Sequence, residues 1–167
     1  MTSKIWLIYK DGEGEWQAEA VADVGDPSAI PLPVDISISS DDSGLWVNTF
    51  MDGTTRLFDM TDPHNPQQVY EKAVGSQVNM ASPSWDGRRV YYTSSLLANW
   101  DKKGEKNEQY FKSLVWDGDQ LVEKYPIEFT EEKLGRAHQM RFGAYSLCSA
   151  ASPEAQAISV AKLDLGN

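Results

Sequence analysis

Hydrophobic and polar residues alternate along short stretches of this chain, and turn-forming residues separate the stretches. Runs rich in β-branched and aromatic residues predict strands at 4–10, 16–24, 34–39, 45–50, 56–60 and 69–74. Asp-Gly and Asp-Pro pairs separate them, as in DGEGE (11–15), MDGTT (51–55) and TDPHNPQQ (61–68). No segment keeps the apolar period of a helix, apart from one helical turn near 130–137. The pattern therefore predicts an all-β meander.

An internal repeat refines this prediction. The stretch SISSDDSGLWVNTF (37–50) aligns without gaps on SPSWDGRRVYYTSS (82–95), a shift of 45 residues. In each copy a Ser-rich strand end, an Asp-containing turn and an aromatic strand follow one another, and third and fourth strands are predicted after them. Four antiparallel strands in about 40–50 residues is the spacing of a β-propeller blade. A sandwich of about ten strands is the alternative, and it would make the repeat accidental.

The repeat divides the chain into pieces of one incomplete propeller unit. We expect a half blade at 1–27, a blade at 31–75, a blade at 78–130 with an insertion at 96–109, and a tail at 131–167 that contains His138. Such a partial β-propeller, of about two and a half four-stranded blades, leaves sheet faces and edges open, because propellers close rings of about 4–8 blades. We therefore expect the remaining blades, a complementary chain or self-association through open edges to complete it.

Charge and hydropathy narrow the range of partners. The chain has 15 basic and 25 acidic residues, a net charge of −10, which argues against binding to nucleic acid or to anionic membrane surfaces. No apolar run approaches the about 18 residues of a membrane span. Residues 1–16 lack the features of a signal peptide. We expect a soluble, cytoplasmic protein, with the periplasm as the alternative if a signal peptide lies upstream of this sequence.

Few residues qualify as ligands or catalysts. Cys148 is the single cysteine, so neither an intramolecular disulfide nor a cysteine-based zinc site is possible. His64 lies in a turn, where an exposed polar residue is expected. His138 lies in GRAHQMRF (135–142), and on its own a single histidine is more often structural than a ligand. A structural role in capping turns and strand ends is the interpretation for Asp35, Asp41, Asp42 and Asp86.

Three separated motifs resemble the selenium-binding protein family, which includes the methanethiol oxidases. They are PLPVDISISSDDSGLWVNTFMDGTTRLFDMTDPHNP (31–66), DGRRVYYTSSLLANWDK (86–102) and RAHQMRF (136–142), and they follow in the family's order. The resemblance covers about residues 28–145 and corresponds to the C-terminal third of family proteins. It implies part of a seven-bladed propeller and a copper-dependent oxidation of methanethiol by dioxygen and water, which gives formaldehyde, hydrogen sulfide and hydrogen peroxide.

The resemblance also implies roles for single residues. A family histidine that binds copper falls on His138, whereas the other copper-binding histidines and the selenium-associated cysteine belong to the family's N-terminal portion. Copper is therefore expected only in the completed protein, with a small thiol as substrate, and no cofactor is expected for this chain alone. Gln139 stands where the family has Glu, and the sequence after Phe142 also departs from the family pattern. Arg141 is expected to pair with an acidic residue of a neighbouring blade.

Two other functions stay open at this point. The chain is alternatively a catalytically inert propeller fragment or split subunit that binds another protein through open blade edges. A third option is a free-standing β-sandwich binding module. The WDK motif (100–102) opens an insertion that is either a lid over the propeller face or a solvated loop.

Overall fold

The strands of this protein are short and all antiparallel. A computed structural model describes residues 3–94, 108–129, 137–140 and 142. Within these ranges there is one 3-10 turn, η1 (Pro27–Ala29), which lies between the second and third strands. The strands are β1 (Lys4–Lys10), β2 (Trp16–Asp23), β3 (Pro33–Ile38), β4 (Gly44–Thr49), β5 (Thr54–Asp59), β6 (Gln67–Ala73), β7 (Val78–Pro83), β8 (Arg89–Ser94), β9 (Tyr110–Trp116) and β10 (Leu121–Glu128).

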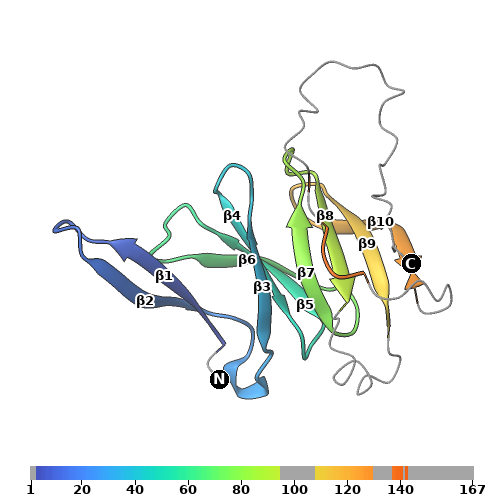
Figure 1. The fold of residues 1–167 in the computed structure, drawn as a ribbon, viewed down its shortest axis with the longest axis horizontal. Helices are drawn as coiled ribbons and strands as arrows, with labels where there is room; N and C mark the ends of the chain where they lie inside the picture. The colour runs from blue at the N-terminus through green and yellow to red at the C-terminus, as the bar shows by residue number, and fades with distance from the viewer. Residues whose placement is uncertain (1–2, 95–107, 130–136, 141, 143–167) are drawn as a thin grey trace, which may run out of the picture.

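Within each sheet, strands that follow one another in the sequence are paired, so the described residues form three meandering sheets. β1 and β2 make a two-stranded sheet, and two four-stranded sheets have the orders β3-β4-β5-β6 and β7-β8-β9-β10 (Figure 1). The predicted all-β, propeller-like fold is confirmed, with strand bounds within two residues of the expected ones. The helical turn expected near 130–137 falls almost wholly outside the described residues. No helix in the part of the chain that the structure describes is long and apolar enough to cross a membrane.

The first turn of each four-stranded sheet is built in the same way. The Ser39 hydroxyl donates to Asp41 Oδ1 at 2.8 Å, and the Ser84 hydroxyl donates to the Asp86 carboxylate. Hydrogen bonds from Ser39 and Ser43 lower the pKa of Asp41 to about 2, and the Ser84 hydroxyl lowers the pKa of Asp86. Asp41 and Asp86 therefore cap turns, as predicted.

Strand β4 of the middle sheet is covered on both faces, so every residue of β4 is buried. Leu45 and Val47 point to one face, where they pack with Phe58 and Val24 against the two-stranded sheet. Trp46 points to the opposite face and joins the cluster formed with the third sheet. The rest of that cluster is Val74, Val78, Ala81, Val90, Tyr92, Tyr110, Leu114 and Leu121.

Three sheets stacked face to face are a propeller arrangement and not a two-sheet sandwich. The second and third sheets approach each other through their first strands, since β7 contacts both β3 and β4. In Figure 1 the two-stranded sheet, the middle sheet and the third sheet follow one another across the molecule. We call β3 and β7 the inner strands, because blades of a propeller meet at the first strand of each sheet.

Candidate functional site

The inner strands are joined by side chains that bind main-chain groups of the next sheet. Asp35 Oδ2 accepts a hydrogen bond from the Ala81 amide at 2.7 Å, and Ser37 Oγ donates to the Ala81 carbonyl at 2.8 Å. Asn48 Nδ2 donates to the Asn79 carbonyl at 2.8 Å. Each of these bonds holds β7 against the middle sheet.

The same contacts recur one sheet further along the chain. Ser82 Oγ donates to the Met140 carbonyl at 2.6 Å, and Thr93 Oγ1 donates to the His138 carbonyl at 2.6 Å. The donors are the residues that the 45-residue shift aligns with Ser37 and Asn48. The acceptors are equally consistent, because Met140 follows Ala81 by 59 residues and His138 follows Asn79 by the same number. Residues 137–140 and 142 therefore lie against the third sheet as β7 lies against the middle sheet.

His138 consequently stands at the position of a third inner strand, and not on an isolated tail. Its side chain is exposed, while its carbonyl anchors the main chain to Thr93. At the other end of the segment the Phe142 ring lies 5.4 Å from the Tyr91 ring, which stacks on Phe111 at 5.7 Å. The exposed His138 imidazole thus lies on the surface that the inner strands form.

The described residues do not by themselves fit a copper centre. No group of three or more His, Cys, Asp or Glu side chains that could hold a metal ion occurs among residues 3–94, 108–129, 137–140 and 142. An exposed imidazole on a fixed main chain can occupy one coordination position, whereas copper sites in proteins use several nitrogen or sulfur ligands. Any copper site that includes His138 therefore needs donors from other polypeptide segments.

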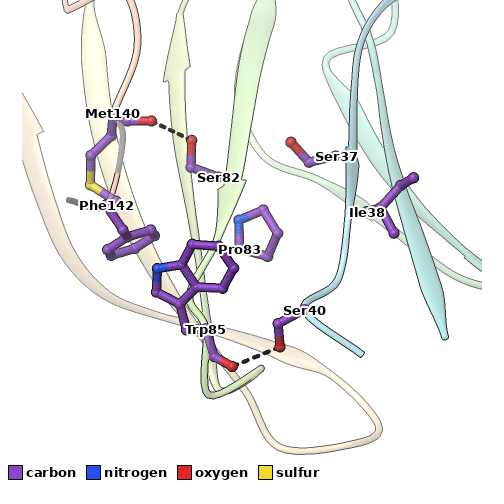
Figure 2. A pocket seen from close by; sticks show the side chains of 8 residues that line it. All are labelled: Ser37, Ile38, Ser40, Ser82, Pro83, Trp85, Met140 and Phe142. Atoms are coloured by element: carbon purple, nitrogen blue, oxygen red, sulfur yellow. Dashed lines mark hydrogen bonds between the residues drawn. The ribbon is translucent and has the colours of Figure 1, made fainter. Parts of the chain in front are cut away.

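A pocket of about 170 Å³ lies at the end of the inner strands that is opposite to His138 (Figure 2). No titratable side chain lines it: its walls are Ser37, Ile38, Ser40, Ser82, Pro83, Trp85, Met140 and Phe142. The hydroxyls of the three serines donate to main-chain carbonyls, including a 2.7 Å bond from Ser40 to Trp85 (Figure 2). Without an acid, a base or a charged group, the pocket offers no catalytic chemistry.

His64 has a structural position. As predicted, it lies exposed in the turn between β5 and β6. Its Nδ1 contacts Glu19 Oε1 on β2, and its ring meets the Tyr9 ring edge-on at 4.8 Å between centroids. His64 therefore links the first two sheets far from the inner strands. No sequence pattern indicates this contact, because Glu19 and His64 are 45 residues apart.

The structure does not test the predictions made for several residues. Arg141, Cys148 and the WDK motif at 100–102 lie outside the described residues. Gln139 is described and exposed. The hydroxyls of Ser82 and Thr93 position the segment that carries His138, and the sequence analysis did not predict this role. The repeat had nevertheless aligned the two residues with Ser37 and Asn48.

Comparison with known proteins identifies the family. The model of the 56 kDa selenium-binding protein family (SBP56) matches residues 1–150. A methanethiol oxidase of Ruegeria pomeroyi is 63% identical over 149 residues, which are 89% of this chain and 34% of the relative. The chain therefore belongs to the 56 kDa selenium-binding protein family, and it spans about a third of the length of the relative it matches.

Solved structures agree with the propeller arrangement. A hypothetical selenium-binding protein from Sulfolobus tokodaii superposes with a TM-score of 0.65 at 25% identity, over 75% of this chain and 35% of that one. The β-propeller domain of Cps50 (Swd1) from Myceliophteria thermophila superposes with a TM-score of 0.54 at 12% identity, over 74% of this chain and 38% of that one. At such low identity the second likeness concerns the fold alone.

Proposed function

We propose that this chain is the C-terminal part of a selenium-binding-protein-like methanethiol oxidase. The completed protein would convert a small thiol, dioxygen and water into an aldehyde, hydrogen sulfide and hydrogen peroxide. The observation that carries this proposal is the 63% identity over 149 residues to a relative named methanethiol oxidase. The cytoplasmic location expected from the sequence stays a prediction.

His138 is the residue that we assign to a copper centre in the completed protein. Neutral imidazole is a ligand that suits copper. The position of His138 supports the assignment, because Thr93 anchors its main chain while its imidazole is exposed on the surface that the inner strands form. The other ligands would come from the remaining propeller blades.

Co-expression with the remaining two thirds of the Ruegeria pomeroyi relative tests the proposal. Copper content is measured by elemental analysis of the purified complex, and hydrogen peroxide release is measured after methanethiol is added. We expect copper and turnover in the complex, and loss of both in His138→Ala. His64→Ala is the matched control, since His64 is also exposed but lies far from the inner strands. One copper per chain without the partner, or full activity in His138→Ala, would contradict the proposal.

The alternative is an inert propeller fragment that works by binding another protein. It is favoured by the outer face of the two-stranded sheet, where Trp6, Ile8 and Trp16 are 55%, 67% and 69% exposed. Exposed apolar side chains gathered on one sheet face are typical of a protein-binding surface. The co-expression experiment separates the two functions, because an inert subunit would form the complex without copper or turnover.

A further inference from the structure

Three polar side chains are buried between the middle sheet and the third sheet. Asn48 of β4 and Thr55 of β5 lie directly opposite each other, and Tyr92 of β8 belongs to the core cluster that joins the two sheets. Each of the three residues is 0% exposed. Asn48 Oδ1, Thr55 Oγ1 and Tyr92 Oη have no hydrogen-bond partner among the described residues. Burial without a partner is unfavourable for such atoms, because each has lost its hydrogen bonds to solvent.

The three side chains meet in the same part of the interface. Residues that oppose each other in an antiparallel pair point to one face, so Asn48 and Thr55 share the face that carries Trp46 toward the third sheet. Asn48 Nδ2 donates to the Asn79 carbonyl at 2.8 Å, and Oδ1 of the same amide needs a partner of its own. Burial raises the pKa of the Tyr92 hydroxyl, and the Thr55 hydroxyl acts in the opposite direction, so these two groups are neighbours.

The equivalent positions at the neighbouring interfaces do not repeat this arrangement. In the third sheet Thr93 lies opposite Phe111 at the same register. The Thr93 hydroxyl already donates to the His138 carbonyl, and the Phe111 side chain has no polar atom. The 45-residue shift aligns Tyr92 with Val47, which packs among apolar residues against the two-stranded sheet. Among the described residues, the three unpaired polar atoms are therefore particular to the interface between the middle and third sheets.

We propose that Asn48, Thr55 and Tyr92 form an internal binding site for one water molecule between these two sheets. A buried water typically makes about three hydrogen bonds, which matches the three atoms. The water donates to Asn48 Oδ1, which can only accept, and it bonds the hydroxyls of Thr55 and Tyr92, which can donate or accept. The ligand is neutral, because these side chains supply no charge that would balance an ion in a buried site. The site does not depend on the proposed enzymatic activity.

The water links two complete sheets through side chains that do not otherwise bond each other. Asn48 and Thr55 belong to the second and third strands of the middle sheet, and Tyr92 belongs to the second strand of the third sheet. The same water fixes the orientation of the Asn48 amide, whose Nδ2 holds the Asn79 carbonyl of β7. Loss of the water should therefore weaken the contact between the sheets without unpairing their strands.

A crystal structure of the full chain, at a resolution that shows ordered water, tests the site directly. We expect one density peak at about 2.6–3.2 Å from Asn48 Oδ1, Thr55 Oγ1 and Tyr92 Oη. The peak should persist in Tyr91→Phe, which loses the same atom from the next residue of β8, because Tyr91 points to the opposite face and stacks on Phe111. No peak at this position, or a direct bond between the Thr55 and Tyr92 hydroxyls, would overturn the proposal.

Urea unfolding of the full chain gives a second test that needs no crystals. Tyr92→Phe and Thr55→Val should each lower the equilibrium constant for folding about fivefold, because each removes one hydrogen bond to the water. The double variant should lose less than the product of the two effects, since both hydroxyls hold the same water. Tyr91→Phe should change the constant less than about twofold.

The sign of the Tyr92→Phe effect is decisive in this assay. A buried hydroxyl that has no partner opposes folding, so its removal would stabilise the chain. A Tyr92→Phe chain that is more stable than the wild-type chain would therefore overturn the water site. Effects of Tyr92→Phe and Thr55→Val that simply multiply in the double variant would also count against it, because two independent groups do not share one ligand.

Discussion

The Thr93 hydroxyl helps to hold the segment around His138 against the third sheet. Thr93→Val keeps the size and the β-branched shape of the side chain but removes the donor to the His138 carbonyl, 2.6 Å away. Thr93 is 3% exposed, so water has little access to replace the lost hydroxyl. The substitution therefore tests whether the segment that carries His138 depends on this bond.

The expected magnitude follows from the usual worth of one hydrogen bond. A buried intramolecular bond contributes about 1 kcal/mol net. A free energy of about 1 kcal/mol corresponds to about a fivefold change in an equilibrium constant. Residues 137–142 should accordingly detach from the third sheet about five times as often in Thr93→Val, while the sheets themselves stay folded.

Hydrogen exchange of a peptide spanning residues 137–142 measures this opening. We expect exchange about fivefold faster in Thr93→Val, and a similar acceleration in Ser82→Ala, which loses the 2.6 Å bond to the Met140 carbonyl. Ser37→Ala is the matched control, because it removes the equivalent 2.8 Å bond one sheet earlier and should leave the peptide unchanged. Unchanged exchange in both Thr93→Val and Ser82→Ala would refute the placement of His138 on a third inner strand.

Three further predictions concern the sheets. Gly75→Ala should lower the melting temperature, because a new Cβ would lie 2.8 Å from Tyr110 Cε1, and such overpacking typically costs about 1–3 kcal/mol. Gly12→Ala is the control and should be nearly neutral, because no atom lies within 4 Å of the new Cβ. Leu114→Ala should cost about 2–5 kcal/mol in urea unfolding, since Leu114 is 1% exposed in the core, and a loss below about 1 kcal/mol would contradict close packing there. Asp41 has its pKa lowered from 3.8 to about 2 in the folded chain, so its stabilising effect is complete above its usual pKa and is lost as the pH falls from 3.8 toward 2. Asp41→Asn should therefore flatten the acid limb of the stability curve in that range, and an unchanged limb would count against the turn contacts.

The fold could be predicted from local sequence because each strand pairs with its neighbour. Alternating side chains in runs such as KIWLIYK and Asp-Gly turns specify antiparallel hairpins without long-range information. The 45-residue shift added the four-strand period, since equivalent turns use the same residues. In both turns the serine hydroxyl donates to the aspartate carboxylate, which also accepts a hydrogen bond from the main-chain amide two residues on. Family motifs in the right order then indicated His138 as the candidate copper ligand.

The position of His138 could not be predicted in the same way. Its segment lacks the length and alternation that predict a strand, and its partners Ser82 and Thr93 are 58 and 45 residues away from the carbonyls that they bind. The link from His64 to Glu19 and the exposure of Ile36 and Ile38 could not be predicted either, because both depend on how the sheets stack.

The sequence by itself determined the strands, the turns and the period of the blades, all of which rest on contacts between residues near one another in the chain. Only the tertiary structure decided that residues 137–140 and 142 take the place of an inner strand, and that side chains of β3 hold β7 against the middle sheet. The physical reason is that side chains from separate sheets make these contacts, and hydrophobic patterning specifies which face is buried without specifying what covers it.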